Sequence, residues 1–165
     1  MGMLSVVVSD ATPLIALAQI ELLHFLSDLF AKVYVPRAVY EEITFHGTDR
    51  PGARIIGQAE WIVVEEVAER SRVEYLLTQM DIGEAEAIVL AEEIQAELVL
   101  LDERKGRAVA QRLGLVIIGT AGLLLLLKEQ GKIAQIRPFL DKLRMLNFRL
   151  SDNVYHQVIS QAGEE

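Results

Sequence analysis

The chain has 165 residues, of which 52% are hydrophobic and none is cysteine. This length predicts a single domain with a buried core, and the lack of cysteine excludes disulfide frameworks and thiolate metal sites. The 16 basic and 24 acidic side chains give a net charge of −8, which argues against a nucleic-acid coat protein, because such proteins are basic. The charge does not exclude a nuclease, since a pocket lined with carboxylates is acidic until it binds a metal ion.

The sequence predicts a cytoplasmic protein that does not enter a membrane. Its first residues lack the basic start and long apolar core of a signal peptide. No apolar run reaches the ~18 residues of a membrane span, and the five leucines at 123–127 are expected to lie in a core helix. The absence of cysteine fits a reducing compartment.

The N-terminal half alternates short apolar runs with helical patterns. Thr12 and Pro13 predict a helix start, with Thr12 as the N-cap and Pro13 at the first helical position. Pro36 ends one strand and opens the next helix. The expected strands are 4–9, 32–35 and 61–64, the expected helices are one from Thr12 onward, 21–30, 36–45, 53–60 and 68–79, and 47–52 is the clearest loop.

The C-terminal half continues this alternation after a break at 80–83. The expected elements are a helix at 83–96, a strand at 98–101, a helix at 104–113, a strand at 115–118, a leucine-rich helix capped by Gly119 and Thr120, and helices near 135–146 and 152–161, the last capped by Ser151. Strands that alternate with helices predict an α/β fold, a three-layer α/β/α sandwich with a mostly parallel sheet and right-handed crossovers. We expect one domain over 1–165, with the C-terminal helices beginning at about 135.

Two of the expected strands end on an aspartate. Asp10 follows the run of valines at 6–8, and Asp102 follows the aliphatic run at 98–101. Such runs are typical of strands buried on both faces of a parallel sheet, and ligands bind outside the carboxyl ends of these strands. Either aspartate alone could cap a helix, but the two together predict an acidic crevice.

A third acid opens the strong helix at 83–96. By helical spacing, Glu84 shares a face with the small and apolar residues Ala87, Ile88 and Ala91, so it is expected to point toward the sheet. Glu86 lies about 200° further around the helix and is expected to face away. A favourable charge at the helix N-terminus would explain an acid in the first turn, but not an acid on the buried stripe.

Two adjacent glutamates in the helix at 36–45 supply a candidate fourth acid. The neighbours of Glu42 favour it over Glu41, although both could be solvated surface acids. Clustered carboxylates repel one another, and a divalent ion offsets that repulsion. Mg²⁺ and Mn²⁺ prefer oxygen ligands, whereas His24, His46 and His156 show no spacing typical of zinc ligands.

These segments resemble the PIN-domain metal-dependent nucleases, a family that includes the VapC toxins of toxin–antitoxin pairs. The resemblance spans roughly 4–127, the C-terminal helices fit an uncharacterised sub-branch, and the matching motifs are residues 8–15, 35–42, 83–88, 101–107 and 118–120. Each motif is weakly specific alone, and the four acids in this order are fairly specific together.

The resemblance implies an α/β/α fold and a Mg²⁺- or Mn²⁺-dependent endoribonuclease acting on RNA. It assigns the catalytic and metal-binding quartet to Asp10, Glu42, Glu84 and Asp102, with Glu41 as the alternate. Thr12 and Thr120 are supporting residues. Position 84 is glutamate where many members have aspartate. Related toxins are often homodimers silenced by an antitoxin protein, so both partners are expected here.

Basic residues follow Asp102 closely. Arg104, Lys105, Arg107 and Arg112 could steer the phosphate backbone of the substrate, or they could form a solvated helix face. Two other functions stay open: a metal-binding or interaction module without turnover, and an aspartyl-phosphate domain of the receiver or phosphatase type.

Overall fold

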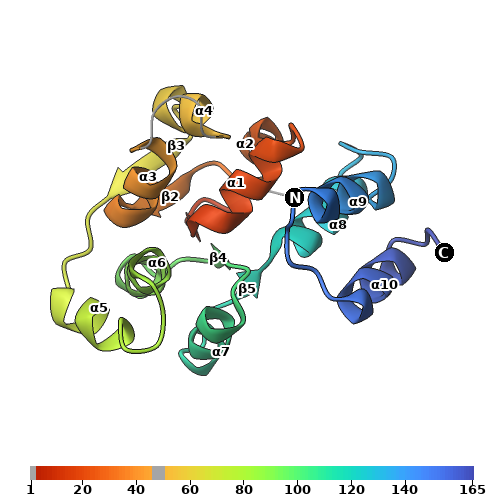
Figure 1. Ribbon diagram of the computed structural model, residues 1–165. Helices are drawn as coiled ribbons and strands as arrows, with labels where there is room; N and C mark the ends of the chain where they lie inside the picture. The colour runs from red at the N-terminus through yellow and green to blue at the C-terminus, as the bar shows by residue number, and fades with distance from the viewer. Residues whose placement is uncertain (1–2, 46–50) are drawn as a thin grey trace.

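The computed structural model describes residues 3–45 and 51–165. Within these residues five parallel strands form one sheet in the order β3-β2-β1-β4-β5 (Figure 1). The strands are β1 Val7–Ser9, β2 Val33–Pro36, β3 Ile62–Glu65, β4 Leu98–Leu100 and β5 Ile117–Ile118. Chain order therefore reverses between β1, the central strand of the sheet, and its neighbour β4.

Helices cover both faces of this sheet. The helices are α1 Ala11–Gln19, η1 Leu23–Phe25 (a 3₁₀ helix), α2 Leu26–Leu29, α3 Arg37–Thr44, α4 Ala53–Gln58, α5 Arg70–Leu76, α6 Ile82–Glu93, α7 Arg104–Arg112, α8 Thr120–Glu129, α9 Arg137–Met145 and α10 Asp152–Gln161. Figure 1 shows α5, α6 and α7 together on one side, and α1, α8, α9 and α10 on the other. The predicted three-layer α/β/α sandwich is confirmed.

The sheet has a hydrophobic cluster on each face because the side chains of its strands alternate between the two faces. Successive side chains of a strand point to opposite faces, so Val7 packs with α1 and α8 while Val8 packs with α6. In β4, Leu98 and Leu100 join the first cluster and Val99 joins the second. A strand that is apolar at every position is therefore buried on both faces.

The leucine-rich helix α8 packs into the cluster that contains Val7, Leu98 and Leu100, as expected. Leu123, Leu124 and Leu127 of α8 are fully buried. No helix in the described part of the chain is long and apolar enough to cross a membrane.

The start of α1 differs from the prediction. The helix begins at Ala11, so the N-cap position belongs to Asp10, whose backbone is extended, and Thr12 is already helical. Asp10 still belongs to the sheet, since its N–H donates to the carbonyl of Leu100 at 3.0 Å. Pro13 lies in the first turn, where a missing N–H costs no intrahelical bond.

The helix predicted over 21–30 is replaced by a helix end and two short turns. Glu21 has a positive φ of 61°, and the Leu22 N–H donates to the Leu17 carbonyl at 2.8 Å. This is the Schellman arrangement that ends a helix, so the first residues of the predicted helix terminate α1. The chain then forms η1 and α2.

Other boundaries shift for local reasons. β1 is shorter than the predicted 4–9, and Leu4 forms only an isolated bridge with Phe30. The predicted break at 80–83 is the start of α6, which has Asp81 as its N-cap. Most of the loop predicted at 47–52 lies outside the described residues, and Gly52 has the positive φ of 86° that precedes α4.

Candidate active site at the carboxyl edge of the sheet

Two aspartates follow neighbouring strands of the sheet. β1 and β4 are paired, with Ser9 opposite Leu100. Asp10 directly follows β1, and Asp102 follows β4 by two residues. Because strand order reverses between these strands, the crevice at their carboxyl ends is the place where open α/β sheets bind ligands.

Asp10 is buried among other acids. Only 4% of the residue is exposed. Burial raises the pKa of its carboxyl well above the ordinary value, the N–H of Ala11 opposes this rise, and the nearby carboxylates of Asp81, Glu84 and Glu42 add to it. A carboxyl in this environment binds a proton or a cation more readily than one in water.

Gly83 at the start of α6 is the point around which three carboxylates meet. A Cβ at this position would lie 3.2 Å from Asp10 Oδ1, 3.3 Å from Glu42 Oε1 and 3.6 Å from Asp81 Oδ1. The three oxygens come from the residue that follows β1, from α3 and from the N-cap of α6, which are far apart in sequence. Glycine leaves the space that lets these groups approach the helix backbone.

Glu84 is the second buried acid, at 6% exposure. Burial and the charges of Asp81, Glu103 and Glu42 raise its pKa to about 7. Its carboxylate lies against α7, since a Cβ at Gly106 would be 3.3 Å from Glu84 Oε2. The predicted inward orientation of Glu84 is therefore the one observed.

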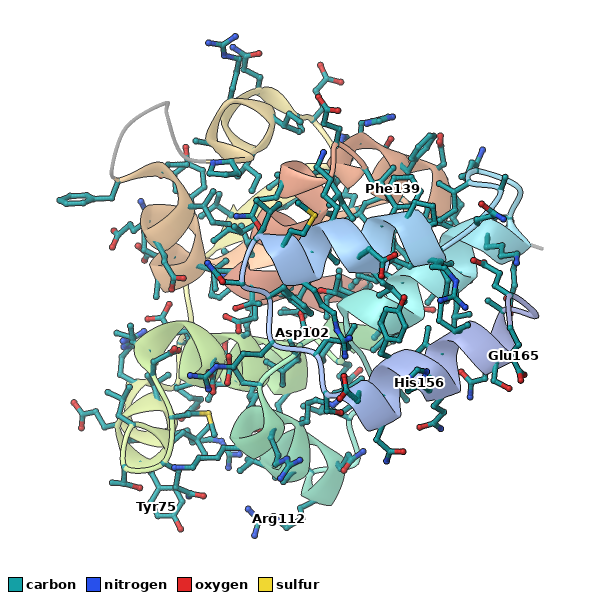
Figure 2. All side chains as sticks on the ribbon, turned by 45° about the vertical axis from the view of Figure 1, so that its right-hand side comes forward. Tyr75, Asp102, Arg112, Phe139, His156 and Glu165 are labelled. Carbon is teal, nitrogen blue, oxygen red and sulfur yellow. The ribbon has the colours of Figure 1, made fainter. Side chains whose placement is uncertain are left out.

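Asp102 is fixed by the first residue of α8. The Thr120 N–H donates to its Oδ1 at 2.8 Å, and the Thr120 hydroxyl donates to its Oδ2 at 2.6 Å. Burial raises the pKa of Asp102, and the two bonds from Thr120 and the charge of Arg107 oppose that rise. Asp102 lies near the middle of the molecule (Figure 2), one strand away from the Asp10 group.

Glu103 links the two parts of the acidic site electrostatically. Its charge raises the pKa of both Glu84 and Asp102. The other carboxylates form two parts. One part is the group of Asp10, Glu42, Asp81 and Glu84, and the other is Asp102 at the end of the neighbouring strand.

Among the curated proteins no match was found, but one family model covers nearly the whole chain. The DUF3368 family, which is described as a PIN domain, matches residues 6–164. This chain belongs to the PIN-domain family. PIN domains are generally nucleases, so the fold is of a nuclease type.

Of the two candidate glutamates on α3, the PIN domain brings Glu42 to the site. Both glutamates are exposed, but it is the Glu42 carboxylate that adjoins Gly83 and raises the pKa of Asp10. Thr12 is half-buried in the first turn of α1. His24 and His156 are exposed, and His46 lies outside the described residues.

The basic residues that follow Asp102 differ in their exposure and contacts. Arg104 and Lys105 are exposed at the start of α7. Arg107 is half-buried, and its Nη1 donates to the Leu101 carbonyl at 3.1 Å. A Cβ at Gly119 would lie 2.8 Å from the same nitrogen and 2.7 Å from Asp102 Oδ1, so Arg107 and Asp102 pack tightly over this glycine.

Two acids of the site were not singled out from the sequence. Asp81 carried a usable signal, because an acid three residues before Glu84 at a helix start is typical of an N-cap, and its Oδ1 accepts from the Glu84 N–H at 2.9 Å. Nothing in the sequence marked Glu103 as a residue of the site apart from its place next to Asp102.

The prediction for Glu86 is wrong. Instead of facing away from the protein, it is 4% exposed, because α3 and α5 both pack against α6. Its Oε1 accepts from the Ala38 N–H at 2.9 Å, and its Oε2 pairs with Arg70 at 2.8 Å. Glu86 therefore joins three helices, including α3, which carries Glu42.

The donor chemistry of the site suits a hard divalent ion. Its acids offer only carboxylate oxygens, which Mg²⁺ and Mn²⁺ prefer. As the side chains stand, no three His, Cys, Asp or Glu residues of the described chain form a group that could hold a metal ion. Gly83 brings the oxygens of three acids near one point, and the long side chains of Glu42 and Glu84 can adjust around it.

Replacing the buried Glu84 with glutamine should flatten the dependence of stability on pH. A folded-state pKa of about 7 lies above the unfolded value, so the folded state binds the extra proton between these values and loses stability as pH rises through them. With chelator present, the free energy of unfolding should fall between pH 5 and pH 8 in both proteins. The fall should be smaller in Glu84→Gln than in the wild type by on the order of 1–2 kcal/mol. Denaturant unfolding at both pH values measures this. Glu41→Gln is the matched control, and equal slopes for Glu84→Gln and wild type would contradict the account.

Removing the Glu86 carboxylate should destabilise the fold. Glu86→Ala leaves the Ala38 N–H without its acceptor and the Arg70 guanidinium without its partner, at a cost of ~1–3 kcal/mol. Glu86→Gln, which keeps an oxygen acceptor, should cost less. Urea unfolding gives the comparison, with the exposed Glu74→Ala as the control that should stay within about 0.5 kcal/mol of wild type.

Proposed function

We propose that this PIN domain is a Mg²⁺- or Mn²⁺-dependent endoribonuclease, with Asp10, Glu42, Glu84 and Asp102 as its acidic set. The observation that carries the proposal is the cluster of repelling carboxylates around the buried Asp10 and Glu84 at the switch point of the sheet. The pKa of Asp10 is raised, and that of Glu84 is raised to about 7. The four acids come from four separate elements of the fold, so the capping of a single helix does not explain why they lie together.

The energetics favour a cation as the occupant. Two unit charges 4 Å apart repel by about 4 kcal/mol at an effective dielectric constant near 20. Burial adds to this cost for Asp10 and Glu84. A divalent ion offsets both costs, and it also attracts the phosphate of a nucleic acid.

In this proposal Asp10, Glu84 and Asp102 would hold the ion, and Glu42 would contribute partly through water. When bound, the ion supplies a Lewis acid that activates water and stabilises the charge on the scissile phosphate. Thr120 fixes the orientation of Asp102 through both oxygens. Asp81 holds the first turn of α6, which positions Glu84.

The phosphate backbone would approach from the start of α7. Arg104 and Lys105 are exposed there, immediately after Asp102 and Glu103. Positive charge beside an acidic site attracts the polyanion and leaves the carboxylates to the ion. Arg107 serves chiefly to position Asp102, since its guanidinium is tied to the Leu101 carbonyl.

The narrower form of the proposal is a cytoplasmic toxin that acts as a homodimer and is silenced by an antitoxin protein. It is supported by the family resemblance of the motifs around Asp10, Glu42 and Glu84. Expression of the chain should then arrest growth, and a small co-encoded neighbour should relieve the arrest.

Changing Asp10 to asparagine should reduce Mg²⁺-dependent RNA cleavage to background while the fold stays intact. The substitution removes a buried negative charge, so in chelator the variant should be slightly more stable than wild type. Cleavage of a mixed RNA pool with Mg²⁺, Mn²⁺ or chelator measures the first effect, and thermal unfolding measures the second. Glu41→Gln is the control that should cut normally.

Undiminished cleavage by Asp10→Asn would sink the proposal. Wild-type protein that binds Mn²⁺ but cuts no RNA would instead identify a metal-binding module without turnover.

A further inference from the structure

A pocket separate from the acidic site lies between α5 and α7. It has a volume of about 450 Å³, and its walls include Arg72, Tyr75 and Gln79 on one side and Arg112 and Leu113 on the other. Figure 2 shows Tyr75 and Arg112 at the same end of the molecule, away from Asp102. Pockets of this size accommodate small organic groups, so a nucleobase with its sugar fits.

The lining combines an aromatic face with positive charge. Tyr75 is 69% exposed, an unusual state for an aromatic residue, and the floor beside it is formed by buried Leu76 and Val109. Arg72 is ion-paired with Glu92 of α6, which holds its guanidinium at the wall. Aromatic rings and planar guanidinium groups both stack on bases, and arginine also binds phosphate.

Helix α7 connects this pocket to the acidic site. It carries Arg104, Lys105, Arg107 and Arg112 and no acid, in a chain whose net charge is −8. Arg104 and Arg112 are eight residues apart, so they lie within about 80° of each other around the helix, and both are exposed. At 1.5 Å per residue the helix spans roughly 13 Å, a distance that a few nucleotides of a single strand can cover.

We propose that the pocket between α5 and α7 binds one base of a single-stranded RNA whose backbone follows α7 to the acidic site. The base stacks on Tyr75, and Arg112 contacts the adjoining phosphate. The inference rests on the proposed nuclease function and names the form of its substrate. The charge of the pocket and helix favours a polyanion over a second copy of this acidic chain as the occupant.

The test measures binding of a fluorescent 12-nucleotide single-stranded RNA by anisotropy, in the uncleaving Asp10→Asn background with Mg²⁺. Adding Tyr75→Ala should weaken binding by ~5- to 100-fold, the range for loss of one stacked base. Tyr75→Phe keeps the ring and should bind nearly as Asp10→Asn alone. Arg112→Ala should weaken binding and lower the slope of log affinity against log salt by about 0.7, as expected for one phosphate contact on a single strand.

Arg54→Ala, which removes an exposed arginine on α4, is the matched control and should not change binding. Tyr75 is exposed, so its variants should fold, and thermal unfolding verifies this. In proteins that keep Asp10, Tyr75→Ala should raise KM for RNA cleavage and leave kcat nearly unchanged, which a structural defect would not do.

Unchanged RNA binding by Tyr75→Ala would overturn the inference and leave the nuclease proposal standing if Asp10→Asn still abolishes cleavage. Unchanged binding with a dimer-to-monomer shift in sedimentation would also overturn it and assign the pocket to self-association. Weakened binding by Tyr75→Ala in a protein that cuts no RNA would support the pocket and reject the nuclease proposal.

Discussion

The repulsion among carboxylates at the carboxyl edge of the sheet is the constraint on which this structure depends. Asp10 and Glu84 are nearly fully buried beside Glu42 and Asp81, an arrangement that costs stability unless a cation or protons offset it. The protein keeps these groups together because each is fixed to a different packed element. The protein thus gives up stability at a place where an open α/β sheet is suited to bind a ligand.

Helix α6 holds this arrangement in place. It is buried along most of its length between the sheet and the helices α3 and α5. Its N-cap and first turn supply Asp81, Gly83 and Glu84 to the site, and Glu86 one half-turn later binds the N-terminus of α3 and Arg70 of α5. The position of Glu42 therefore depends on a carboxylate that does not belong to the acidic cluster. Two glutamates two residues apart on the same helix, Glu84 and Glu86, thus have different roles.

The positions of the charged side chains matter more for ligand binding by this protein than its net charge. The chain is acidic overall, and its most concentrated positive charge lies on α7, directly after Asp102. An acidic pocket with a basic helix at its rim separates the binding of a cation from the attraction of a polyanion. The same helix leads to the pocket that contains Tyr75, so in our two proposals α7 joins the metal site to the pocket that binds a base.

The sequence by itself determined the fold class and the inward orientation of Glu84, because buried strands and helical stripes have periods that can be read locally. It also placed Asp10 and Asp102 at strand ends. It did not determine the cap of α1, the environment of Glu86 or the participation of Asp81. Those depend on which helices lie over α6 and on where the chain leaves the sheet. The sequence favoured Glu42 over Glu41, but only the tertiary structure shows that the Glu42 carboxylate lies beside Gly83, because the contact is made with α6, which is distant in sequence.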